Sequence, residues 1–271
     1  MNDPASLMIS RDRLEKLYAL YHHRELVHPD PLEFLYDYPD LGDREVVALV
    51  ASSLAYGRVA QILKSVSTVL ERMNPSPSDF LLNSSLESLL STFSDFKHRF
   101  TTGEQLALML WNAKGLIEQY DTLYACFAAL SEHSDDTVLP ALSAFVRAFN
   151  PSPQTNGKFS LLPSPHRGSA CKRLNLFLRW MVRRDEVDPG GWDSVPASKL
   201  IVPLDIHMHR ICLSLRLTAR RQGDLRTAVD ITHAFRKIAP EDPVRYDFVI
   251  TRLGIRKDAD LAGFLKACSM Q

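Results

Sequence analysis

Apolar residues recur at helical spacing along almost the whole chain. In residues 172–184 they stand at positions i, i+3, i+4 and i+7, on one helix face: Leu174, Phe177, Leu178 and Met181. The same periodicity predicts helices over about residues 10–22, 31–37, 44–54, 114–131, 137–149, 206–217, 224–239 and 243–253, and others around Ile62–Leu70, Leu106–Leu110 and Leu261–Leu265. No alternating run is long enough to predict a strand. The sequence therefore predicts an all-α protein.

The charge distribution is uneven, although the formal net charge is zero. Residues 160–221 hold 11 lysines and arginines against five acids, whereas residues 1–50 hold five basic and ten acidic residues. A basic segment on a neutral protein favours a local contact with a polyanion. The alternative interpretation is a solvated, arginine-rich face without a partner.

Cysteine usage and hydropathy exclude several classes of protein. The four cysteines lie 41 to 56 residues apart and form no Cys-x-x-Cys motif, so we expect no zinc site, no iron–sulfur cluster and no other cofactor. Scattered cysteines are typical of reduced thiols in a cytoplasmic protein. No apolar run approaches ~18 residues, so we expect no membrane span. We also expect no signal peptide, and a monomer.

Lys172 is the first residue that suggests chemistry. It follows the turn-like stretch Arg167–Cys171 and opens an apolar-periodic helix. A lysine is a nucleophile only as the neutral amine. The positive end of the helix dipole and the neighbouring Arg173 both disfavour the ammonium form, which favours an amine able to form a Schiff base. The alternative is an exposed lysine at a helix end.

Asp205 is the second such residue. Aspartate is a preferred N-cap, and an apolar helix follows Asp205 directly, so capping alone explains its presence. Capping and chemistry are nevertheless compatible, because one carboxylate oxygen can cap the helix while the other faces a cleft.

Neighbouring residues offer further contacts. His207 and His209 are two positions apart and lie on different faces of a helix, so they do not chelate one metal ion. We expect one of them to pack or hydrogen-bond and the other to lie near a phosphate. The segment Tyr56-Gly57-Arg58 stands between two predicted helices. It is interpreted either as a helix–helix turn that needs glycine or as a segment that enters a DNA groove.

Two segments resemble a known superfamily. Residues 168–178 resemble the helix-hairpin-helix element of the endonuclease III-like DNA glycosylases, which reads Gly-x-Gly, x-Lys and then a helix; this chain has Gly168-Ser169-Ala170-Cys171-Lys172. Residues 204–211 resemble the stretch Val-Asp-Thr-His-Val-x-Arg-Val that carries that superfamily's catalytic aspartate. Alanine replaces the second hairpin glycine. The 33 positions from Lys172 to Asp205 resemble the archaeal 8-oxoguanine DNA glycosylase branch. The whole chain also resembles a related bacterial family of unknown function.

The resemblance implies a fold, a substrate and residue roles. Residues 44–185, with the hairpin, would form a helical barrel lobe, and residues 1–43 plus 186–271 a second lobe built from both termini. In double-stranded DNA, Lys172 would attack C1′ of a damaged or abasic nucleotide, with assistance from Asp205, and would expel an oxidised purine. The residues expected to bind DNA are Arg167, Gly168, Ser169, Ala170, Arg173, His207, Arg210, Tyr56 and Arg58.

Two other interpretations stay open at the level of the sequence. One is a helix-hairpin-helix protein that binds nucleic acid without catalysis, which the basic segment and the altered hairpin favour. It predicts salt-dependent DNA binding and no product. The other is an unrelated helical scaffold that binds a protein partner, which predicts no affinity for DNA even at low salt.

Overall fold

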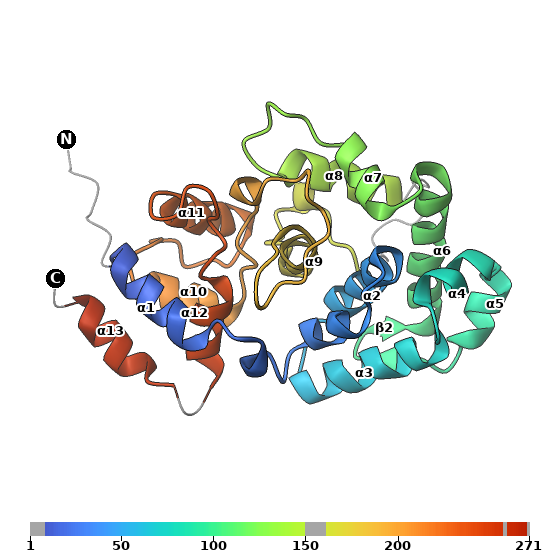
Figure 1. The fold of residues 1–271 in the computed structure, drawn as a ribbon, viewed down its shortest axis with the longest axis horizontal. Coiled ribbons are helices and arrows are strands. Elements are labelled where there is room, and N and C mark those ends of the chain that lie inside the picture. Colours follow the sequence, from blue (N-terminus) through green and yellow to red (C-terminus); the bar gives the residue numbers. More distant parts are fainter. Residues whose placement is uncertain (1–8, 150–160, 257–258, 270–271) are drawn as a thin grey trace.

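The computed structural model describes residues 9–149, 161–256 and 259–269, and nearly all of its regular structure is helical (Figure 1). The α-helices are α1 (Arg11–Tyr21), α2 (Leu41–Ser53), α3 (Val59–Arg72), α4 (Pro77–Asn83), α5 (Leu86–Thr92), α6 (Gly103–Tyr120), α7 (Leu123–Ala129), α8 (Leu139–Phe149), α9 (Lys172–Val182), α10 (Ile206–Ser214), α11 (Leu225–Arg236), α12 (Asp247–Ile255) and α13 (Leu261–Ser269). The 3-10 helices are η1 (Arg24–Leu26), η2 (Pro31–Asp37), η3 (Pro165–Arg167) and η4 (Ala197–Lys199). The predicted all-α class is confirmed.

One predicted helix is divided in two. The periodicity predicted a single helix over residues 114–131, but α6 ends at Tyr120 and α7 begins at Leu123. The break follows from local backbone chemistry: Asp121 takes a φ of 74°, which a helix does not tolerate. The side chain of Thr122 then caps α7 by accepting a hydrogen bond from the amide of Ala125 at 2.8 Å.

A short β-hairpin was not predicted. Strands β1 (Lys97–His98) and β2 (Thr101–Thr102) pair in antiparallel register, with His98 opposite Thr101. Arg99 and Phe100 form the connecting turn. Each strand has only two residues, too few for an alternating pattern to be recognised in the sequence.

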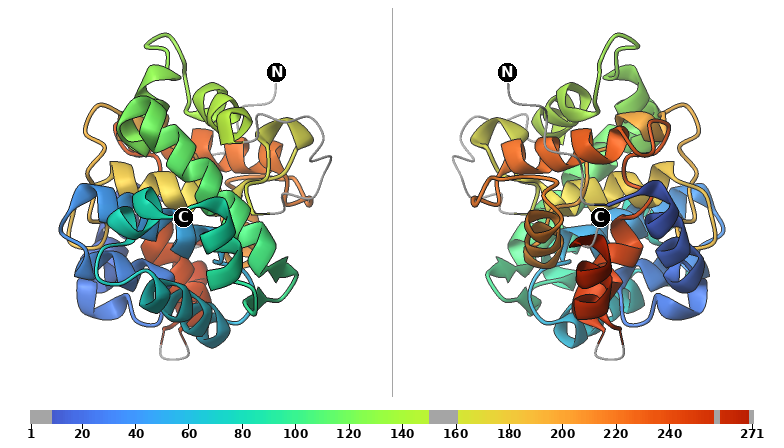
Figure 2. Two further views of the ribbon diagram at one scale, coloured as in Figure 1. Left: turned by 90° about the vertical axis from the view of Figure 1, so that its right-hand side faces the viewer. Right: turned by 90° about the vertical axis from the view of Figure 1, so that its left-hand side faces the viewer.

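Helix α9 lies in the middle of the molecule, with α2–α6 on one side and α1 and α10–α13 on the other (Figure 1). Its predicted apolar stripe is fully buried, and the helix packs on α2. Helix α1 contacts α12, and α13 lies at the outer surface of the same side (Figure 2). The boundary between the two lobes at residue 43 stays a prediction. Helix η2 lies before this boundary, yet it contacts α2 and α3, which lie after it.

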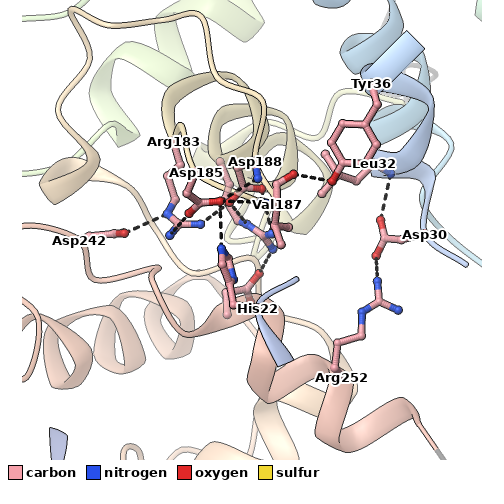
Figure 3. Close-up of polar contacts among 12 residues, drawn as sticks. His22, Asp30, Leu32, Tyr36, Arg183, Asp185, Val187, Asp188, Asp242 and Arg252 are labelled. Carbon is pink, nitrogen blue, oxygen red and sulfur yellow. Dashed lines mark hydrogen bonds and ion pairs between the residues drawn. The ribbon is translucent and has the colours of Figure 1, made fainter. Parts of the chain in front are cut away.

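Two buried arginines lie at the end of α9: Arg179 in its last turn and Arg183 directly after it. Arg179 donates two hydrogen bonds to Asp188, at 3.1 and 2.9 Å, and one to Asp247 at 2.6 Å. Arg183 also pairs with Asp188, and its Nε donates to Asp242 at 2.9 Å (Figure 3). These five residues, called the buried ion cluster below, tie α9 to the turn that follows it and to the first residue of α12. Loss of one partner would leave an uncompensated buried charge.

Asp185 extends this cluster to the end of α1. Its Oδ2 lies 2.7 Å from Nη2 of Arg183, and its Oδ1 lies 2.9 Å from Nε2 of His22 (Figure 3). Burial raises the pKa of Asp185, but contact with His22 and the charge of Arg183 outweigh burial and hold the pKa well below its usual range. The ionised carboxylate therefore stabilises the fold at neutral pH.

Part of the positive charge of residues 160–221 is internal. Arg179 and Arg183 are 3% and 4% exposed, and both are neutralised by buried or half-buried aspartates. Lys199 donates to the carbonyls of Glu132 and His133 at 3.2 and 3.0 Å. The surface of this segment is therefore less basic than its composition indicated.

Replacing Asp188 by alanine should destabilise the protein by about 3–5 kcal/mol, because two buried arginines lose a shared partner. Urea denaturation measures the change in the free energy of unfolding. Asp95→Ala is the matched control, since it removes the exposed partner of Arg72, and exposed pairs contribute little. Equal midpoints for the two variants would contradict the importance of the buried ion cluster.

Asp185→Asn should lower the thermal midpoint at pH 7, and the gap from wild type should narrow as the pH falls. A carboxyl with a depressed folded pKa stabilises the fold above its unfolded value of 3.8, and this stabilisation is lost as pH falls toward the folded pKa. Thermal melts from pH 7 down to about pH 2 test this window. A gap that stays constant over the whole range would show that ionisation of Asp185 is not responsible.

Candidate active site

A tight turn places Lys172 at the first position of α9. Gly168 has a φ of 74°, which favours glycine, and its amide donates to the carbonyl of Pro165 at 2.9 Å. Cys171 takes a φ of 49° and turns the chain into the helix. The amide of Leu225 donates to the carbonyl of Gly168 at 3.0 Å, which fastens the turn to the start of α11. Only the 3-10 helix η3 directly precedes this turn, so the helix-hairpin-helix element stays a prediction.

The two carboxylate oxygens of Asp205 make different contacts, one with the start of α10 and the other with Lys172. Oδ1 accepts a hydrogen bond from the amide of Met208 at 2.8 Å and caps α10. Oδ2 lies 3.3 Å from Nζ of Lys172, whose side chain is 36% exposed. The structure thus brings the two residues together at the starts of two helices.

Both residues line a cavity of about 300 Å³. Its walls come from five separate parts of the chain: residues 29–31, residues 55–62, α9, residues 203–207 and α12. Exposed aliphatic side chains stand on its lining, namely Val59, Ile206 and Ile255. Its volume is at the lower end of the range for small-ligand pockets. An apolar wall around a few convergent charged groups is typical of a binding site.

Asp247 belongs both to the buried ion cluster and to the cavity lining. Its Oδ2 accepts from Arg179, whereas its Oδ1 has no hydrogen-bond partner within the described residues. Burial raises the pKa of Asp247 to about 6; Arg179 opposes this rise and the carboxylate of Asp205 adds to it.

An ion pair closes another wall of the cavity. Asp30 caps η2 through Oδ1, which accepts from the amide of Leu32 at 3.0 Å. Its Oδ2 accepts from Nη2 of Arg252 at 2.7 Å (Figure 3). Asp30, Asp247 and Arg252 were not predicted, because they come from the first and last thirds of the chain and form no spaced motif.

Several of the predicted DNA contacts face solvent or the cavity. Arg167, Gly168 and Ser169 are exposed, and Arg58 is exposed at the start of α3. His207 lines the cavity, and Arg210 is exposed one helical turn further on. The amide of Gly168 is already used within the turn, and Ser169 forms an antiparallel bridge with Asp224.

Other predicted contacts are turned inward. Nη1 of Arg173 donates to the carbonyl of Ser53 at 2.8 Å, so this side chain fastens α9 to the end of α2. The hydroxyl of Tyr56 donates to the carbonyl of His98 at 2.9 Å and does not project into solvent. Gly57 has a φ of 102°, as the interpretation of a glycine-dependent turn requires.

The histidine pair separates as the sequence predicted. A ring nitrogen of His209 lies 2.8 Å from the carbonyl of Arg220, which acts as the acceptor, while His207 faces the cavity. Neither contributes to a cluster of metal-binding side chains among the described residues. Such a cluster, formed by His23, Glu25 and Glu186, lies at the surface and not in the cavity lining. His23 is already hydrogen-bonded there to Glu186 and to the carbonyl of Ala19.

Comparison with known proteins identifies the family. A family model described as "Protein of unknown function (DUF2400)" matches residues 30–256, so the chain belongs to that family. The matched region includes Lys172, Asp205 and Asp247. No curated protein and no solved structure matches the chain. Within the part of the chain that the structure describes, no helix has both the length and the apolar character needed to cross a membrane.

The two functions of the Asp205 side chain can be separated by substitution. Alanine removes the cap and should cost about 1 kcal/mol of stability, whereas asparagine caps a helix as well as aspartate and should cost little. Chemical denaturation of both variants measures the difference. Equal destabilisation by Asn and Ala would show that the ion pair with Lys172, and not the cap, provides the stability.

Proposed function

We propose that this DUF2400 protein is a DNA base-excision glycosylase with abasic-site lyase activity. One observation carries the proposal: Nζ of Lys172 and Oδ2 of Asp205 are 3.3 Å apart at the starts of two helices and line one cavity. The two segments that contain them resemble the hairpin and the catalytic stretch of the endonuclease III-like superfamily. A helical fold of two lobes with a helix-hairpin-helix element is part of the proposal.

The pair provides a nucleophile and its base. Asp205 is the carboxylate next to Lys172, and it accepts the proton that the ammonium must lose. The neutral amine then attacks C1′ of the sugar. The new C–N bond forms as the bond from C1′ to the base breaks, and the base leaves with the bonding electrons and takes up a proton. Asp205 also stabilises the positive charge that develops on the sugar.

The covalent intermediate explains the lyase step. Opening of the sugar ring gives a protonated Schiff base between Nζ of Lys172 and C1′. This cation acidifies the hydrogen on C2′. When that proton is lost, the bond between C3′ and its phosphate oxygen breaks. The phosphate leaves, and the strand is cut. Water then hydrolyses the Schiff base and restores the amine.

The cavity has room for a single nucleobase that has left the helical stack. Flipping a base costs a few kcal/mol and is easiest for a damaged or mispaired one. A purine oxidised at C8 carries an N–H donor at N7 that the intact purine lacks. Asp247, a carboxylate residue of the cavity lining, would be the acceptor for this N–H, which favours an oxidised purine as the substrate.

A DNA-binding protein without catalysis is the second candidate. The contact between Lys172 and Asp205 is compatible with it, because a half-exposed ion pair of this kind also occurs in proteins as a structural contact without catalysis. Exposed Arg58, Arg167 and Arg210 would then contact phosphates, and affinity would fall steeply with salt.

Borohydride reduction distinguishes the two candidates. Wild-type protein mixed with a duplex that contains an abasic site or 8-oxoguanine should form a covalent complex on reduction. Lys172→Ala should abolish this complex, and Lys64→Ala, which changes an exposed lysine on α3, should not. Asp205→Asn keeps the cap and should slow complex formation by about 10²–10⁴-fold.

Each result leads to a different conclusion. Covalent trapping of Lys172→Ala would contradict the assignment of the nucleophile. Salt-sensitive binding of DNA without trapping of the wild type would favour the non-catalytic candidate. Asp40→Asn is the control for the Asp205 variant, since Asp40 caps α2 in the same way.

A further inference from the structure

We propose that His23, Glu25 and Glu186 bind one divalent transition-metal ion of the Zn²⁺ type at the protein surface. The ligand atoms of these side chains, a ring nitrogen and two carboxylate oxygens, all lie within 4.8 Å of one another. His23 and Glu25 lie just after α1, whereas Glu186 lies in the turn that follows α9. None of the three lines the cavity, so the site does not depend on the proposed function.

The ring of His23 is oriented as that of a metal-binding histidine. Its Nε2 lies 2.8 Å from the carbonyl oxygen of Ala19 on α1. A carbonyl oxygen only accepts, so Nε2 carries the hydrogen and Nδ1 is the nitrogen that is left for a metal ion. Histidines that bind metals almost always donate their other N–H to a carbonyl or carboxylate oxygen in this way, which fixes the tautomer and the ring orientation.

The Nδ1 atom of His23 faces acceptor atoms. It lies 3.1 and 3.3 Å from the two carboxylate oxygens of Glu186. A lone pair on Nδ1 would repel these oxygens, so a proton or a metal ion must lie between them. Zinc bonds of about 2.0–2.1 Å in a tetrahedron place neighbouring ligand atoms about 3.3 Å apart. The ring and the carboxylate therefore already have nearly the separation that a shared zinc ion requires.

Glu25 distinguishes this site from an ordinary pair of histidine and carboxylate. A proton on His23 balances the charge of one carboxylate, and the second carboxylate stays unbalanced. Arg24 does not provide the missing charge, because its guanidinium stacks on the ring of Tyr36 at 3.9 Å, and Glu25 forms no ion pair within the described residues. A divalent ion balances both carboxylates. The imidazole ligand favours Zn²⁺ over Mg²⁺ or Ca²⁺, and water would complete the coordination.

The position of the site indicates a structural role. His22 and Asp185, the residues that precede His23 and Glu186, are already in contact at 2.9 Å (Figure 3). Asp185 also pairs with Arg183 of the buried ion cluster. A metal ion would therefore join the end of α1 to the turn after α9 at the surface, beside the buried contact that joins the same two segments.

The sequence predicted no zinc site, because the cysteines lack metal-binding spacing. That prediction concerned cysteine ligands. His23 and Glu186 are 163 positions apart, so no spaced motif announces them, and only the folded chain brings them together.

Titration of chelator-treated protein with Zn²⁺ in a calorimeter tests the site. The wild type should bind one ion per chain. His23→Ala should abolish this binding. Glu186→Gln, which keeps the shape of the side chain, should weaken it by at least the about 10–100-fold that loss of an indirect partner of a metal site costs. Excess Mg²⁺ should not compete, because it prefers oxygen ligands.

His28→Ala is the matched control. His28 is also exposed and lies 2.9 Å from Glu33, but the described residues provide no third ligand beside that pair. This variant should bind Zn²⁺ as the wild type does. The four cysteines are buried in the folded protein, so they should not contribute to the titration.

Hydrogen exchange tests the structural role. Zn²⁺ should slow amide exchange at the end of α1 and in residues 183–188, in the wild type and His28→Ala but not in His23→Ala. Zinc binding that survives His23→Ala, or no binding tighter than about 1 mM in the wild type, would overturn the site. Binding at the site without slower exchange would overturn its structural role.

Discussion

The buried ion cluster is the constraint on which the candidate active site depends. Arg179 lies on the same helix as Lys172, about two turns further along, and Arg183 directly follows the end of that helix. Arg179 holds the helix against the first residue of α12, and Arg183 holds it against Asp242. Buried charges tolerate few alternative arrangements, because each unpaired arginine or aspartate would be strongly unfavourable. The position of Lys172 relative to α12 is therefore determined by ionic contacts deep in the protein.

Asp247 connects this cluster with the cavity. One of its oxygens neutralises Arg179, and the other has no partner among the described residues although it is buried. The same carboxylate therefore belongs both to the ionic contacts that hold α9 and to the lining of the cavity, and burial raises its pKa to about 6.

Much of the helical architecture could be predicted from the sequence. Burial of one helix face makes apolar residues recur at the helical period, and this recurrence is visible in the sequence itself. The helix cap by Asp205 was also recognisable, since a cap is a local interaction. The β1–β2 hairpin was not, because two-residue strands have no pattern. Asp247 and Arg252 were also missed, because their importance arises from neighbours far away in the chain.

Charge counting was the least reliable guide. It assumed that the arginines of residues 160–221 lie at the surface. Arg179 and Arg183 are instead buried and paired with aspartates, and composition does not show which charges pair. Arg173, a predicted DNA contact, instead donates to the carbonyl of Ser53. Which charges pair across long sequence distances depends on the tertiary structure, so it cannot be predicted from composition alone.

In the proposed reaction, the amine of Lys172 forms a bond to the sugar of a nucleotide in the cavity. Peptide mapping by mass spectrometry of a borohydride-reduced complex with abasic-site DNA tests it most directly. The account predicts that the sugar remnant is attached to Nζ of Lys172, at the first position of α9. Attachment to any other amine, or recovery of only unmodified protein, would contradict it.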